Sequence, residues 1–89
     1  MTFKKPGMDQ FSKAIIIGKE KRLFQFTRME NANGVKFFIT SKDANEKPIA
    51  FSLRQNRYDV NWRLAPGSLR WLYAIEEKLS DAIIETQLN

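Results

Sequence analysis

The segment PGSLRWLYAIEEKLSDAIIET, residues 66–86, decides the fold of this 89-residue chain, because it is its one strongly helical pattern. Pro66 suits the first position of a helix, where a missing N–H costs nothing, and Ser68 offers a hydroxyl cap if the helix begins two residues later. Seven apolar residues form a stripe roughly 160° wide on a helical wheel, against ~100° for an ordinary surface helix. They are Leu69, Trp71, Leu72, Ile75, Leu79, Ala82 and Ile83. A helix this apolar must lie against another layer.

The preceding residues supply a sheet, because four segments have the alternating or β-branched patterns of strands. They are Lys13–Gly18, Arg22–Glu30, the run after Gly34 and the run that opens with Pro48. Alternation returns at Val60, Trp62 and Leu64, so we expect the fourth strand to be interrupted around residues 55–59. Short connections favour antiparallel pairing. The predicted fold class is α+β, a four-stranded antiparallel meander sheet followed by one C-terminal helix, β-β-β-β-α.

The dipeptide Asn33-Gly34 between two alternating runs predicts a two-residue type I′ hairpin loop, since both central residues need φ > 0. This loop would place Met29 opposite Phe38. One face of the sheet is then the core, with side chains Phe24, Phe26, Val35, Phe37 and Ile39. The other face is open to solvent.

The length predicts a single sheet-plus-helix domain at residues 13–89. Residues 1–12 show no periodicity and contain Pro6 and Gly7, so we expect a flexible N-terminal arm. No apolar run is long enough to span a membrane, and no signal-peptide pattern is present, which predicts a soluble cytoplasmic protein with no membrane partner.

The chain contains no Cys and no His, which removes disulfides, the usual nucleophile–base pairs and the commonest metal ligand. The neighbouring acids Glu76 and Glu77 fall on the solvent side of the helical wheel, where carboxylates do not acquire the separated pKa values that acid–base catalysis needs. We therefore expect no enzyme, no catalytic residues, no metal site and no cofactor.

The net charge of +5 is unevenly distributed. Residues 1–65 hold 13 Lys and Arg against 6 Asp and Glu, whereas residues 66–89 hold 2 against 4. A basic sheet and an acidic helix polarise the molecule, which favours a polyanion on the sheet side.

The open face combines basic, polar and aromatic side chains. Eight of them are candidate nucleic-acid-binding residues: Gln25, Thr27, Lys36, Phe38, Thr40, Lys42, Ser52 and Arg54. Bases stack on aromatic rings while Lys and Arg follow the phosphates, so Phe38 among lysines favours single-stranded DNA or RNA as the partner. The alternative is that Phe38 packs against the N-terminal arm or a second subunit.

The apolar stripe of the helix is wider than one thin sheet requires. Trp71, Tyr73 and Ile84 account for the surplus, and we expect them to form the interface of a homodimer. The alternative is that they pack on residues 57–64. A rival function follows from the same surplus, namely a protein-interaction or assembly module in which the sheet face or the helix docks a protein partner.

Three stretches carry a resemblance to a known family: NGVKFFITSKD at residues 33–43, PIAFSL at 48–53 and LAPGSLRWLYAIEEKLSDAI at 64–83. In this layout the chain resembles the Pur-alpha repeat and the related coactivator positive cofactor four. The resemblance implies binding of single-stranded DNA or RNA on the sheet, with contacts from the eight candidate residues, and dimerisation through sheet edges and helices. The sequence departs from the pattern at Ala65, where the family often has a polar cap, and at Arg57–Arg63, which has no counterpart.

Overall fold

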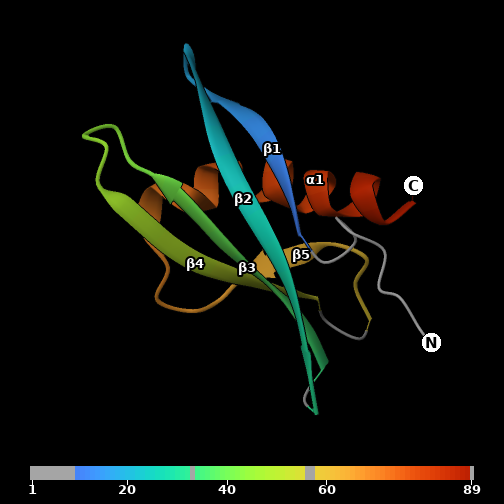
Figure 1. Ribbon diagram of the computed structural model, residues 1–89. Coiled ribbons are helices and arrows are strands. Elements are labelled where there is room, and N and C mark those ends of the chain that lie inside the picture. Colours follow the sequence, from blue (N-terminus) through green and yellow to red (C-terminus); the bar gives the residue numbers. More distant parts are fainter. Residues whose placement is uncertain (1–9, 33, 56–57, 89) are drawn as a thin grey trace, which may run out of the picture.

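The computed structural model describes residues 10–32, 34–55 and 58–88, which form five strands followed by a helical segment (Figure 1). The elements are β1 (Gln10–Ile17), β2 (Glu20–Asn31), β3 (Gly34–Lys42), β4 (Pro48–Gln55), β5 (Trp62–Leu64), the 3-10 helix η1 (Arg70–Ile75) and α1 (Glu76–Leu88). The strands make one sheet in chain order, and every neighbouring pair is antiparallel. The α+β class and the antiparallel sheet with a C-terminal helix are confirmed, and the sheet has one strand more than predicted.

The additional strand is β5, which comes from the second half of the segment expected as an interrupted fourth strand. Leu64 pairs with Leu53 and Trp62 pairs with Gln55, so the chain reverses after β4 instead of continuing in the same direction. The Gln55 side-chain amide donates to the Val60 carbonyl at 2.8 Å, which helps to hold this reversal.

The β2–β3 hairpin has the predicted faces but not the predicted register. Asn31 pairs with Gly34, and Thr27 rather than Met29 lies opposite Phe38. Gly34 has a φ of 120°, a conformation that glycine adopts at little cost. The pairing overturns the type I′ loop predicted at Asn33-Gly34, of which Asn33 lies outside the described residues. Because side chains alternate with a period of two, a shift of two residues leaves each one on its predicted face.

The core lies between the sheet and the helical segment, with α1 across one face of the twisted sheet (Figure 1). Its buried side chains are Ile15, Phe24, Phe26, Phe37, Ile39, Phe51, Leu53, Trp62, Leu64, Leu72, Ile75, Leu79, Ala82 and Ile83. Aromatic rings make much of it: Phe37 meets Trp62 edge to face with centroids 5.0 Å apart, and Phe11 stacks on Phe26 at 4.4 Å. Such pairs add to the stabilisation that burial alone provides.

The helical segment begins later than predicted, with η1 at Arg70. Pro66–Gly67 form a turn whose glycine has a φ of 85°, so the proline is not the first helical residue. Ser68 donates its hydroxyl hydrogen to the Ala65 carbonyl at 2.6 Å and caps no helix. The N-cap position belongs to Leu69, which makes no side-chain cap hydrogen bond and lies half exposed outside the core.

Helix α1 covers the outer edge of β5. Ser80 accepts a hydrogen bond from the Trp62 backbone N–H at 2.8 Å, and a Glu76 carboxylate oxygen accepts one from the Leu64 N–H at 2.8 Å. These side chains replace the neighbouring strand that an edge would otherwise need.

The same helix reaches β1 at the other side of the sheet. Lys78 donates to the Ile16 carbonyl at 2.8 Å, and the Lys13 ammonium lies 3.4 Å from a Glu85 carboxylate oxygen. Both edge strands of the sheet therefore meet one helix, which bridges them across the core.

Strand β1 begins at Gln10, so residues 10–12 of the predicted N-terminal arm lie in the sheet. The rest of that arm, residues 1–9, lies outside the described residues. No helix in the described part of the chain is both long and apolar enough to cross a membrane.

Candidate nucleic-acid interface

All eight candidate residues lie on the open face, defined here as the sheet face opposite α1. The strand register arranges this face in rows that cross the sheet, with neighbouring strands about 4.8 Å apart. The first row, the cationic row, consists of Met29, Lys36, Arg54 and Arg63. Three positive side chains thus stand side by side on β3, β4 and β5.

The second row, the aromatic row, consists of Gln10, Thr27, Phe38 and Ser52. Phe38 is its one large apolar side chain, and it is partly buried between its neighbours. The third row, the polar row, consists of Ser12, Gln25, Thr40 and Ala50. Hydroxyl and amide groups therefore surround a single aromatic ring.

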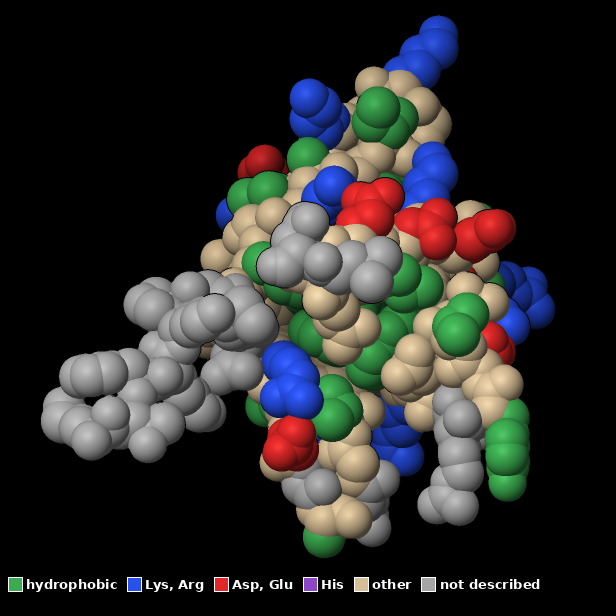
Figure 2. Space-filling model, turned by 90° about the vertical axis from the view of Figure 1, so that its right-hand side faces the viewer, with side chains coloured by type: hydrophobic (Ala, Val, Ile, Leu, Met, Phe, Trp, Pro, Cys, Tyr) green, Lys and Arg blue, Asp and Glu red, His purple; other side chains and the backbone are tan. Residues whose placement is uncertain are grey.

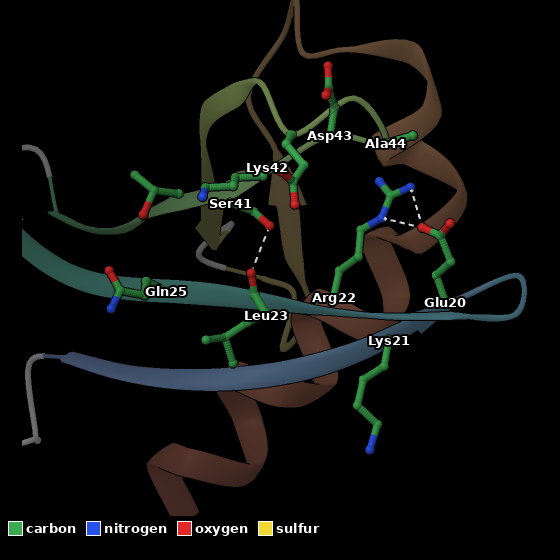
Figure 3. A pocket seen from close by; sticks show the side chains of 11 residues that line it. Glu20, Lys21, Arg22, Leu23, Gln25, Ser41, Lys42, Asp43 and Ala44 are labelled. Carbon is green, nitrogen blue, oxygen red and sulfur yellow. Dashed lines mark hydrogen bonds and ion pairs between the residues drawn. The ribbon is translucent and has the colours of Figure 1, made fainter.

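Beyond the polar row, β2 and β3 separate. Their last backbone pair is Gln25 with Thr40, and the Ser41 hydroxyl then donates to the Leu23 carbonyl at 2.8 Å (Figure 3). The divergence opens a pocket of about 620 Å³ between the start of β2 and the connection from β3 to β4. Lys42 lies at this pocket, at the opposite end of β3 from Lys36.

Most other charges around this pocket are already engaged. Arg22 lies 3.0 Å from Glu20 and 5.6 Å from the centre of the Trp71 ring (Figure 3 shows the ion pair). An Asp43 carboxylate oxygen accepts the backbone N–H groups of residues 45 and 47, which fixes the connection between β3 and β4. Lys42 forms no ion pair within the described residues, so its charge is available to a ligand.

The distribution of charge between the faces is one-sided. The register places five cations on the open face: Lys21, Lys36, Lys42, Arg54 and Arg63. Among the described strand residues, no carboxylate lies on this face. The two acidic strand residues, Glu20 and Glu30, lie on the opposite face of the sheet. An anion approaching the strands of the open face thus meets positive charge, and the carboxylates near it come from outside the strands: Asp59 and Glu76 at Arg63, and Asp43 and Glu46 at the pocket.

The five cations differ in how far they are neutralised. Arg63 lies 3.1 Å from Asp59 and 3.7 Å from Glu76, so its charge is largely compensated. Lys36 and Arg54 form no ion pair with any other described residue. Four of the five cations, Lys21, Lys36, Lys42 and Arg54, are therefore not neutralised by an ion pair within the described residues, and Phe38 lies between Lys36 and Lys42 on β3.

The loop between β4 and β5 borders the cationic row and is held by Asp59. This carboxylate accepts the Asn61 backbone N–H at 2.9 Å and binds the Arg63 guanidinium. The Asn61 N–H, followed by Arg63, lowers the pKa of Asp59 below its ordinary value. Next to it Tyr58 and Val60 are 89% and 73% exposed.

The three residues expected at a dimer interface do not form one exposed patch. Trp71 and Ile84 are partly buried and pack against the core of their own chain. Tyr73 is exposed, and its hydroxyl donates to the Ala65 carbonyl at 3.4 Å.

The eight candidates leave out two cations and two large apolar residues of the open face: Lys21, Arg63, Leu23 and Ile16. Arg63 was omitted because the pairing of β5 with β4 was not foreseen. Leu23 alternates with Gln25 and so belongs to the same face, a signal that the sequence does contain. Leu23 is 61% exposed and Ile16 55%, which adds an apolar area beside the polar row.

The described residues contain no group of three or more His, Cys, Asp or Glu side chains placed to hold a metal ion. Comparisons with known proteins add no assignment. The chain matches no protein-family model, no curated protein and no solved structure.

Proposed function

We propose that the chain binds single-stranded nucleic acid, DNA or RNA, on the open face of its sheet, without catalysis. The observation that carries the proposal is the open face itself, with five cations and no carboxylate among its described strand residues. Nucleic-acid affinity depends chiefly on neutralising phosphates, and this face is the one that attracts them.

The ligand path follows β3. Lys36 and Lys42 are six residues apart on this strand, a distance of roughly 20 Å. Phe38 lies between them, where a base can stack, and Thr27 and Ser52 beside it can hydrogen-bond sugars and base edges. A strand with phosphates at both ends of this path and a base over Phe38 uses every class of side chain that the face offers.

The resemblance to the Pur-alpha repeat and positive cofactor four supports the same proposal, because it implies single-strand binding on a sheet of this kind. The observed antiparallel sheet with a C-terminal helix agrees with that layout. The homodimer and the cytoplasmic location stay predictions.

Fluorescence anisotropy of labelled single-stranded DNA and RNA, with duplex as competitor, tests the proposal at low and at physiological salt. We expect salt-dependent binding that prefers single strands over duplex, because a base must be unpaired to stack on Phe38. Weak binding that is equal for every polyanion, including heparin, and absent at physiological salt would refute it.

A second candidate function rests on the exposed apolar side chains Leu23 and Ile16. A protein-interaction module would use this apolar area, and not Phe38, as its docking surface. A chain that ignores oligonucleotides but captures a protein partner, and loses it on Leu23→Ser, would favour this function.

A further inference from the structure

The pocket at the divergence of β2 and β3 lies at one end of the proposed ligand path. It opens where the ladder between the two strands stops, because Gln25 pairs with Thr40 and no further pair of this register follows. The pocket measures about 620 Å³, and every residue that lines it belongs to the described part of the chain. A volume of this size is in the range of sites that take small molecules.

The pocket is within reach of a nucleotide next to the one whose base stacks on Phe38. Thr40 lines the pocket and follows Phe38 by two residues on β3, so the two side chains lie on one face roughly 7 Å apart. Lys42 also lines the pocket, and its charge can hold the phosphate of that nucleotide. A single strand that follows β3 therefore brings the neighbouring base to the pocket.

The pocket also contains a carboxylate that is available to a ligand, that of Glu46. Of the other two acidic residues in its lining, Glu20 binds Arg22 at 3.0 Å, and Asp43 accepts two backbone N–H groups of its own loop. The Glu46 side chain makes no ion pair and no hydrogen bond with any described residue. Its backbone has a φ of 63°, and its N–H donates to the Asp43 carbonyl at 2.9 Å, which fixes where the side chain begins.

Two uncharged side chains complete the lining that a base would meet. Gln25 and Thr40 lie opposite each other as the last pair of the ladder, and neither side chain is hydrogen-bonded to another residue in the described ranges. The Gln25 amide and the Thr40 hydroxyl can each donate and accept a hydrogen bond. Together with Glu46 they provide donors for the ring acceptors of a base and an acceptor for its amino group.

We infer that the pocket holds one unpaired base and prefers a base with an exocyclic amino group, such as cytosine, over thymine and uracil. This inference rests on the proposed function and names the ligand class of the same site. The amino group donates to the Glu46 carboxylate, as the N4 amino group of cytosine does to acidic side chains in general. Thymine and uracil carry a carbonyl oxygen at that position, so two acceptors would face each other.

Anisotropy titrations with labelled oligodeoxycytidine and oligodeoxythymidine of equal length, at neutral pH, test the inference. The two oligomers have the same backbone charge and rings of the same size, so their phosphates do not distinguish them. We expect the parent to bind the cytidine oligomer at least about fivefold more tightly. Glu46→Gln should bring the ratio of the two dissociation constants close to one, because an amide can accept from cytosine and donate to thymine alike.

Glu77→Gln is the matched control. It removes the same charge from α1, near whose end acidic side chains lie together on the surface (Figure 2). This variant should keep the parent ratio, because α1 lies on the opposite side of the sheet from the open face.

Glu46→Gly is a second variant, because glycine adopts a positive φ at little cost and the fold is retained without the carboxylate. It should also abolish the preference, at a urea midpoint no lower than that of the parent. A parent that binds both oligomers equally, or a cytidine preference that survives both Glu46 variants, would overturn the inference and leave the proposed function standing. Absence of binding to either oligomer at low salt would overturn the proposed function, and the inference with it.

Discussion

Ser80 on α1 accepts a hydrogen bond from the backbone N–H of Trp62 on β5 at 2.8 Å, and both residues are buried. This contact joins the helix to the sheet edge through a buried hydrogen bond. Ser80→Ala removes the acceptor and leaves a buried donor unsatisfied, so we expect a loss of about 1–3 kcal/mol in the free energy of unfolding. The midpoint of urea unfolding measures it.

Thr86→Ala is the matched control on the same helix. The Thr86 hydroxyl donates to the Ala82 carbonyl one turn earlier, and that carbonyl belongs to the helix itself. Loss of this hydrogen bond should lower the free energy of unfolding by much less than Ser80→Ala does. Equal destabilisation by the two variants would show that Ser80 acts only through helix propensity.

Phe38→Ala should weaken the binding of single-stranded oligonucleotides by roughly 5- to 150-fold, corresponding to about 1–3 kcal/mol for one stacked base. The loss should persist at high salt, because stacking does not depend on counterion release. Leu23→Ala is the control, since it removes an exposed apolar side chain from another part of the same face. Anisotropy titrations give the dissociation constants of both variants. A larger loss of affinity in Leu23→Ala than in Phe38→Ala would contradict the assigned position of the base.

Lys36→Ala and Arg54→Ala should each reduce the slope of log K against log salt by about 0.7, the value for one phosphate contact with a single strand. Arg63→Ala should change the slope less, because Asp59 and Glu76 already compensate this guanidinium. Arg70→Ala, an equal loss of charge on the helical segment, provides the baseline. Equal slopes for Lys36→Ala and Arg70→Ala would mean that net charge alone governs binding.

Asp59 makes the stability of the chain depend on pH at the acid end. Its pKa is lowered in the folded chain, so its contribution is complete above the unfolded pKa and is lost as the pH falls through the folded pKa. Asp59→Asn keeps an oxygen for the Asn61 N–H but loses the charge. Urea midpoints of parent and variant should therefore differ near neutral pH and converge between about pH 4 and pH 2, given an ordinary Asp pKa of about 3.9. A constant difference over this range would contradict the role of the charge.

The faces of the sheet could be predicted from the sequence because they depend only on the alternation of side chains. Phe24, Phe26, Phe37 and Ile39 are buried as predicted, and the eight candidate residues share the opposite face. The register could not be obtained in this way, because a shift of two residues preserves every face while it changes every partner. The hairpin turn decides between such registers, and its signal at Asn33-Gly34 favoured the wrong one.

The missed features depend on contacts between residues far apart in the sequence. The alternation at Val60, Trp62 and Leu64 indicated strand but not a separate one, because β5 is defined by its pairing with β4 and its hydrogen bonds to α1. The helical segment begins at Arg70 and not at Pro66, because the chain needs a turn with positive φ at Gly67 to cross from the sheet to the helix. Tertiary geometry overrides the local preference of proline for a first helical position.

The bridge that α1 makes between β1 and β5 has a consequence for how the chain is made. All five strands leave the ribosome before the helix, so both sheet edges are exposed in the nascent polypeptide until the last segment has emerged. A product that stops short of residue 76 lacks the side chains that block β5 and the lysine that reaches β1. Translation that is interrupted late should therefore yield a product that aggregates more readily than the same sheet completed by its helix.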